Sequence, residues 1–170
     1  YIWKGFNLAP LATSNSSNPY IVVTMHDKAE ADALLARGFD GHFSFRDESN
    51  VRPNTVNPDF NFWHELDGMF PCISSLEVAV YDRGYGTDTL IGSTTIDLED
   101  RWFDKEWRRL RDIQQVPREN RTLFNHSSMV PQGKVEMWVE MYEPKTAVDI
   151  PIVPIEAPQI TEWELRLVVW

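Results

Sequence analysis

The feature that most constrains the fold is a series of short segments in which apolar residues alternate with polar ones. Gly, Pro, Asn and Asp residues separate these segments. Alternation over so few residues is typical of β-strands with one buried face, and the close spacing favours antiparallel strands over βαβ units. We therefore predict an all-β sandwich. Its expected strands are residues 1–8, 19–26, 41–47, 60–66, 75–82, 90–98, 133–143 and 163–170.

Two segments instead carry a helical pattern. In residues 27–38, Asp27 is placed as the N-cap, Glu30 follows three residues later, and Gly38 is placed to end the helix. Residues 102–113 have apolar side chains at helical spacing. These stripe residues are Phe103, Trp107, Leu110 and, less regularly, Ile113.

The chain of 170 residues is long enough for one domain with its own core. Seven Trp residues suggest that large flat side chains fill this core. Those expected there are Trp3, Trp63, Trp107 and Trp138. Cys72 is the single cysteine, which excludes an intrachain disulfide, and we interpret it as a buried, inert thiol in a reducing cytosol.

Charge is distributed unevenly along the chain. The net charge is −10, which argues against nonspecific nucleic-acid binding. Residues 101–121, called the basic segment below, hold seven basic and four acidic residues, whereas the rest holds nine basic and 22 acidic ones. The basic residues are Arg101, Lys105, Arg108, Arg109, Arg111, Arg118 and Arg121.

Several longer motifs carry a family resemblance. The stretches "NPYIVV", "NTVNPDFN", "LEVAVYD" and "LIGSTTIDLEDRWF" resemble those of a C2 domain. The stretches "PNTVNPDFNFWHELDGMFP" and "TLFNHSSMVPQGKVEMWVEM" narrow the resemblance to the tandem C2 domains of the ferlin family. The resemblance covers about Trp3 to Tyr142 and implies an eight-stranded antiparallel sandwich with short helical insertions and functional loops at one end.

The resemblance also locates the loops that hold calcium in calcium-binding C2 domains. The family's acidic positions fall on Ala12 and Asn18 in the first loop and on Asp82, Gly84 and Thr89 in the third. Only Asp82 carries a carboxylate. Asp88 lies one residue from the last position and is a weaker candidate, as is Asp82 itself. Calcium requires six to eight hard oxygen ligands, so we expect no calcium site.

Without a metal, the polar residues of the first loop need another role. The stretch "ATSNSSN" supplies amides and hydroxyls that bind turn backbones, and Asn18-Pro19 is interpreted as a turn that leads into a strand. We expect the Asp82 carboxylate to accept backbone hydrogen bonds.

The basic segment has two interpretations. Its arginines can pair locally with Asp104, Glu106 and Asp112, or they can bind an anionic lipid headgroup or an acidic protein partner. The candidate binding residues are Arg101, Lys105, Arg108, Arg109 and Arg111. The concave sheet face, where C2 domains commonly bind lipid, offers only Arg46 and Arg52 among acids, which weakens a membrane role there.

No motif indicates catalysis. His26, His42, His64 and His126 lack metal-binding spacing, no G-x-S-x-G sequence occurs, and "GYG" at 84–86 lacks the context of a dinucleotide site. We therefore expect a noncatalytic, calcium-independent module without a cofactor. The resemblance implies a docking or spacer unit in vesicle trafficking and membrane fusion, at the cytoplasmic face of a membrane. The alternative is a peripheral phospholipid-binding module that uses the basic segment.

The C-terminal part has a different texture. Residues 144–161 contain four prolines, which favour an extended, semi-rigid linker between the C2 domain (1–143) and residues 162–170. The stretch "TEWELRLVVW" resembles the first strand of a following C2 domain, so neighbouring C2 domains are expected partners. We hypothesise that this strand adds to a sheet edge, either of its own copy or of a second copy as a strand-swapped dimer.

Overall fold

The computed structural model describes residues 1–10, 15–27, 44–68, 70, 73–128 and 130–156, together with Glu162, Glu164 and Arg166. The predicted helix at 27–38, apart from Asp27, lies outside these residues. So do Ala12, His42, Cys72 and most of the predicted strand at 163–170. Predictions about those positions stay predictions. Asp27 itself is the last residue of a strand rather than a position in a helix.

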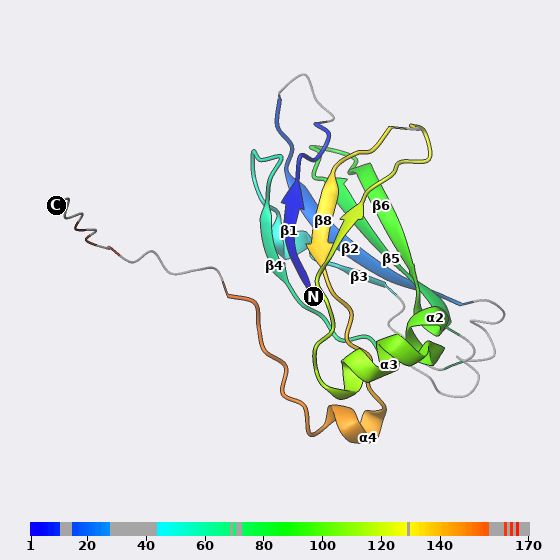
Figure 1. Ribbon diagram of the computed structural model, residues 1–170. Helices are drawn as coiled ribbons and strands as arrows, with labels where there is room; N and C mark the ends of the chain where they lie inside the picture. Colours follow the sequence, from blue (N-terminus) through cyan, green and yellow to red (C-terminus); the bar gives the residue numbers. More distant parts are fainter. Residues whose placement is uncertain are drawn as a thin grey trace.

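The described residues form two antiparallel sheets of four strands each, packed face to face (Figure 1). The first sheet has the order β4-β1-β8-β7, with β1 (Ile2–Phe6), β4 (Asp59–Phe62), β7 (Glu119–Thr122) and β8 (Lys134–Met137). The second has the order β3-β2-β5-β6, with β2 (Pro19–Asp27), β3 (Ser44–Arg46), β5 (Ile73–Asp82) and β6 (Thr89–Asp97). The predicted eight-stranded antiparallel sandwich is confirmed.

The core lies between the two sheets and follows the alternation of the strands. On β2, Ile21, Val23 and Met25 face the core, whereas Tyr20 and Val22 pack with Ala79 in a smaller cluster on the other face of the sheet. Ile21 and Val78 have no exposed surface. Fully burying such a side chain contributes about 1.5–3 kcal/mol, so the two-residue pattern fixes which face of each strand is inside.

Some strand boundaries differ from the prediction. Strand β7 was not predicted, because its sequence "ENRT" is polar and carries no apolar alternation. Strand β8 ends at Met137 rather than at residue 143, although Val139 and Met141 still pack against the core. The backbone of Trp138 still exchanges two hydrogen bonds with that of Tyr1, at 3.0 and 3.1 Å, just beyond the end of the strand.

The predicted helix at 102–113 is helical over most of its length, but it is wrong as a single helix. The chain instead forms α2 (Leu98–Phe103) and α3 (Lys105–Asp112), separated by Asp104 in an extended conformation. The Asp104 carboxylate accepts from two α3 backbone N–H groups, and Asp97 caps α2 in the same way, so two acidic N-caps divide the region. Two short elements complete the fold, the 3-10 helix η1 (Glu48–Asn50) and α4 (Pro144–Ala147). Helix α4 begins the segment for which the prolines favoured an extended conformation.

The four tryptophans expected in the core do not lie there. Trp63 is 40% exposed, and Trp3, Trp107 and Trp138 are half-buried. The Arg101 guanidinium lies 3.6 Å from the Trp107 ring centroid. Stacking of this kind lets a large aromatic ring cover the surface of the sandwich while its outer face meets a cation instead of the interior.

The functional regions lie at opposite ends of the sandwich. Figure 1 shows α2, α3 and α4 at one end and the turn between β5 and β6 at the other. In the part of the chain that the structure describes, no helix is long and apolar enough to cross a bilayer. Because they lie at opposite ends of the sandwich, the degenerate calcium loops and the basic segment are two separate candidate sites.

Candidate functional site

Asn18 connects three loops at the end of the sandwich where calcium would bind in the family. Its backbone N–H donates to the Asp82 carboxylate at 2.7 Å, and its backbone carbonyl accepts from the Arg83 N–H at 3.0 Å. Its side-chain Oδ1 accepts from the Asn54 N–H at 3.0 Å. The prediction that Asp82 accepts a backbone hydrogen bond is confirmed.

The neutral residues around Asn18 close this end of the sandwich through turn hydrogen bonds. Asn54 has a φ of +56°, in the left-handed region that Asn tolerates better than most residues. The Thr55 N–H donates to the Ser17 carbonyl at 2.9 Å, and the Ser16 hydroxyl donates to the Asn54 side chain. Amides and hydroxyls therefore supply the hydrogen bonds that hold the 15–18 segment to the 53–57 turn.

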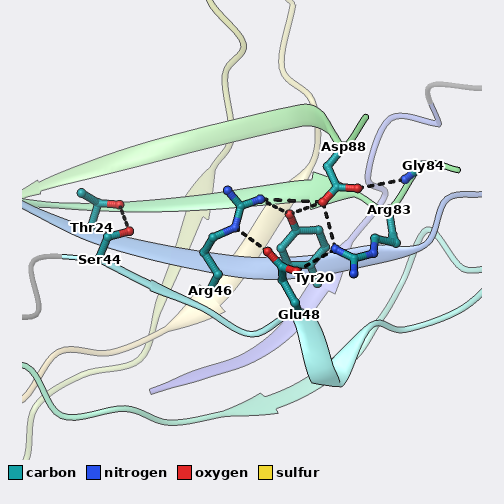
Figure 2. Close-up of polar contacts among 8 residues, drawn as sticks. All are labelled: Tyr20, Thr24, Ser44, Arg46, Glu48, Arg83, Gly84 and Asp88. Atoms are coloured by element: carbon teal, nitrogen blue, oxygen red, sulfur yellow. Dashed lines mark hydrogen bonds and ion pairs between the residues drawn. The ribbon is translucent and has the colours of Figure 1, made fainter. Parts of the chain in front are cut away.

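A cluster of arginines and carboxylates lies beside these loops. We call Tyr20, Arg46, Glu48, Arg83 and Asp88 the arginine–carboxylate cluster (Figure 2). Asp88 accepts from the Tyr20 hydroxyl at 2.8 Å and from the Arg83 guanidinium at 3.1 Å, and Arg46 lies 3.7 Å from the same carboxylate. Glu48 bridges both arginines, with contacts of 2.9 Å to each.

The cluster is anchored to the sheet by aromatic rings. Tyr20 is fully buried and stacks on Tyr81 with centroids 5.9 Å apart. The Arg46 guanidinium lies 5.4 Å from the Tyr81 centroid, and it also donates to the Tyr20 hydroxyl. Packing against Tyr81 fixes the position of the Tyr20 hydroxyl. This hydroxyl in turn positions the Arg46 guanidinium and the Asp88 carboxylate.

Hydrogen bonding sets the charge states in the cluster. The bond from Tyr20 holds the pKa of Asp88 below its ordinary value of 3.8. Burial, followed by the bond to Asp88, raises the pKa of Tyr20. Bonds to Glu48 and Asp88 raise the pKa of Arg83, and the bond to Tyr20 raises the pKa of Arg46. These pKa shifts all favour the charged forms of Arg46, Arg83 and Asp88 and the neutral phenol of Tyr20.

The described residues at this end do not fit a calcium ion. Gly84 and Thr89 stand where the family has acids, and the Gly84 N–H donates to Asp88 at 3.2 Å. Asp82 and Asp88 are already engaged by N–H and guanidinium donors. Among the described residues, no three His, Cys, Asp or Glu side chains are grouped to hold a metal. A cation placed here would displace existing donors and meet two guanidinium charges.

The sequence analysis missed most of this cluster. It identified Asp82 and Asp88 but gave no role to Tyr20 or Arg83, and it treated Arg46 only as a candidate on the sheet face. One signal was available, because Arg83 directly follows the third-loop acid Asp82.

The basic segment pairs largely with its own acids. Arg109 contacts Glu106 at 2.6 Å, and Arg111 contacts Asp112 at 3.2 Å, as the local-pairing interpretation expected. The third predicted acid, Asp104, caps α3 instead. Three further arginines engage residues outside the helices. Arg101 and Arg121 both contact Glu119, and Arg118 lies 3.9 Å from Glu136.

Two cations of the basic segment remain without such pairing. Within the part of the chain that the structure describes, Lys105 and Arg108 have no ion-pair partner. Together with Arg109, Asp112 and Ile113 they line a shallow hollow on α3. The exposed Ile113 places an apolar side chain beside these cations. Of the five candidate binding residues, the structure therefore brings Lys105, Arg108 and Arg109 together and turns Arg101 and Arg111 to other contacts.

Two of the described histidines, His26 and His64, have ordinary partners. His26 contacts Glu77 at 3.1 Å, and His64 stacks on Phe45 with centroids 3.8 Å apart. These contacts give the two imidazoles structural roles at the surface of the sandwich.

Comparison with known proteins agrees with this geometry. Residues 1–113 match the C2 domain family. The chain is 39% identical over 158 residues to Ferlin 2 of Toxoplasma gondii, which covers 90% of the chain and 10% of that protein. It is 28% identical to Ferlin 1 of the same organism over all 170 residues of the chain, which cover 12% of that protein.

A vertebrate relative shows the same similarity over a shorter region. The chain is 32% identical over 106 residues to myoferlin of Xenopus tropicalis, which covers 62% of the chain and 5% of that protein. The chain thus spans about a tenth or less of these relatives, which is the size of one module in a long protein. It belongs to the C2 domain family and is a C2 domain of the ferlin type.

Proposed function

We propose that this domain is a noncatalytic, calcium-independent C2 module that acts as a docking or spacer unit. The ferlin-type sequence supports a role within a membrane-trafficking protein. In this proposal the module works at the cytoplasmic face of a membrane during vesicle fusion, next to neighbouring C2 domains. It contributes a fixed shape and a surface, and no reaction.

The observation that carries the proposal is the arginine–carboxylate cluster. In a metal-dependent domain, opposing carboxylates repel each other until a cation binds, and the loops order around that cation. Here Arg46 and Arg83 neutralise Glu48 and Asp88 from within the chain, at distances of 2.9 to 3.7 Å. The loop end is therefore held together by the Arg46 and Arg83 side chains. Unlike a bound metal ion, these cations are part of the chain and are present at any calcium concentration.

Weak binding of an anionic lipid headgroup is a second candidate function. It is favoured by Lys105 and Arg108, which lack ion-pair partners among the described residues, beside the exposed Ile113. Exposed contacts of this kind are screened over about 8 Å at physiological salt. We therefore expect binding that is weak and salt-sensitive.

Liposome sedimentation distinguishes the two functions. The domain is mixed with neutral vesicles, with phosphatidylserine vesicles and with phosphoinositide vesicles, each with calcium or with a chelator. The docking proposal predicts no increase in sedimentation when calcium is added to any vesicle. The lipid-binding candidate predicts sedimentation with anionic vesicles at low salt, lost in the Arg108→Glu/Arg109→Glu variant.

A matched control separates a specific site from general charge. Lys134→Glu/Lys145→Glu changes the net charge by the same amount at exposed positions of β8 and α4. The control should sediment as the unchanged domain does. Calcium-dependent sedimentation would overturn the proposed function, and binding that survives the double arginine change would place the lipid site elsewhere.

A further inference from the structure

Helix α3 has one face packed against the sandwich and one face in water. The side chains of Trp107 and Leu110 are half-buried, whereas those of Lys105 and Arg108 are exposed. On the packed face, the Arg101 guanidinium lies 3.6 Å from the Trp107 ring centroid. This stacking holds α3 in place with its cationic face turned to solvent.

Exposed apolar side chains stand at both ends of α3. Phe103, the last residue of α2, is 58% exposed and lies two positions before Lys105. Ile113, the C-cap of α3, is 47% exposed and lines the shallow hollow with Lys105 and Arg108. Cations between exposed apolar side chains are typical of helices that lie in the interface of an anionic membrane.

The charge of α3 suits an anionic surface, although the chain as a whole is acidic. Residues 105–112 hold four basic and two acidic residues, a net charge of +2, against −10 for the chain. Among the described residues, Lys105 and Arg108 have no ion-pair partner, so contact with lipid phosphates breaks no existing pair. The nearby helix α4 is less suited, because exposed Glu143 and Asp149 flank its Lys145.

The loop end is the competing surface. Tyr85 is fully exposed in the turn between β5 and β6, and Val130 is 65% exposed in the connection between β7 and β8. Figure 1 shows both connections at the loop end. However, Arg46 and Arg83 are both paired with Glu48 there. An anionic membrane would have to compete with this internal carboxylate, which it does not meet at Lys105 and Arg108.

We propose that the domain docks on an anionic membrane through the exposed face of α3, with Phe103 and Ile113 among the lipid headgroups and the loop end turned away from the bilayer. Docking in this orientation rests on the lipid-binding candidate described under the proposed function. Because the hollow is shallow, it contacts a headgroup from one side only. Lys105 and Arg108 therefore respond to the charge density of the surface rather than to the identity of the headgroup.

Two matched double variants identify the docking face. Phe103→Ser/Ile113→Ser removes two exposed apolar side chains beside α3, Tyr85→Ser/Val130→Ser removes two at the loop end, and neither changes the net charge. With phosphatidylserine vesicles at low salt, the α3 variant should sediment about tenfold more weakly than the unchanged chain, since interfacial binding scales with buried apolar area. The loop-end variant should sediment as the unchanged chain does. Thermal unfolding verifies that both variants are folded.

A measurement on the unchanged chain gives the orientation without any substitution. The chain is bound to phosphatidylserine nanodiscs that contain a lipid with a nitroxide on its headgroup, in the presence of a calcium chelator. In two-dimensional NMR, the nitroxide should broaden the backbone amide signals of residues 103–113. The signals of residues 83–88 should keep their intensity.

Lipid composition tests whether charge density or headgroup identity is recognised. Vesicles with phosphatidylserine and vesicles with phosphatidylinositol bisphosphate, prepared at equal surface charge, should bind the chain equally. In 1 M salt the screening length falls to about 3 Å, so most of the binding to both should be lost.

Four results would overturn the inference. They are no sedimentation with anionic vesicles, an equal or larger loss in the loop-end variant, broadening at 83–88 without broadening at 103–113, and preference for one headgroup at equal charge. Binding of polyglutamate without any vesicle binding would assign the α3 face to an acidic protein instead. All of these leave the calcium-independent role intact, because α3 contains no residue of the arginine–carboxylate cluster. Only calcium-dependent sedimentation contradicts that role.

Discussion

Asp82 and Asp88 show how partners decide the role of a carboxylate. Asp82 matches a third-loop acidic position of the family and Asp88 lies one residue from another, yet Asp82 accepts an N–H from Asn18 and Asp88 accepts from Tyr20, Arg83 and Gly84. A carboxylate with several donors is stabilised in its ionised form and gains little from a metal. At this scale, the chemistry of the loop end follows from hydrogen-bond donors on neighbouring strands.

Asp88 should contribute to the pH dependence of folding. Its pKa in the folded state lies below 3.8, so its stabilising contribution is present above that pH and is lost as pH falls through the folded-state value. We predict that Asp88→Asn lowers the free energy of unfolding at pH 6 and that the loss shrinks near pH 3. Urea denaturation at both pH values measures the difference.

Asp149→Asn is the matched control, because Asp149 is exposed and lies outside the cluster. It should leave the free energy of unfolding nearly unchanged at both pH values. A loss for Asp88→Asn that is equally large at pH 3 and at pH 6 would show that the contact with Tyr20 does not depend on the charge of Asp88.

At the scale of elements, the sandwich was predictable and its helical insert was not. Strands β2, β5 and β6 were anticipated because their apolar residues alternate and face one core. The predicted helix at 102–113 contains all of α3, but the division from α2 was missed because a continuous apolar stripe suggested one helix, whereas Asp97 and Asp104 begin two. The N-cap at Asp104 therefore determines where α3 begins, because the apolar stripe stays largely exposed and adds little burial to favour one continuous helix.

Asp104 should therefore stabilise α3 measurably. Its carboxylate accepts from the Glu106 N–H at 2.8 Å and from the Trp107 N–H at 3.1 Å. Loss of an N-cap typically costs about 1 kcal/mol, so Asp104→Ala should lower the free energy of unfolding by about that amount. Urea denaturation checks this value. Asp112→Ala, at the other end of α3, should change it by less than half as much, and equal losses would contradict the capping role.

The candidate site was only partly predictable, because some of its residues meet only after the strands pair. The sequence predicts that calcium ligands are missing, because Gly84 and Thr89 cannot supply carboxylates. The replacement cations are not visible, since Arg46 and Arg83 come from different strand ends and meet only when β3 and β5 each pair with β2. Trp3 and Trp138 were misassigned for the same reason, because both rings meet Arg118, which is distant from them in sequence.

At the scale of the whole molecule, the two ends of the sandwich carry differently arranged charged side chains. The loop end is closed by internal ion pairs, and the helical end presents Lys105 and Arg108 to solvent. The two candidate sites thus lie on separate surfaces of the sandwich (Figure 1).

A calcium titration monitored by thermal unfolding tests the central claim most directly. A ligand that binds only the folded state adds about 2.7 kcal/mol at a hundredfold excess over its Kd, which for a chain of this size raises the Tm by about 5 to 10 °C. With the arginine–carboxylate cluster in place of a metal, we predict no appreciable change in Tm from chelator to millimolar calcium. A rise of several degrees that Asp82→Asn abolishes would contradict the account.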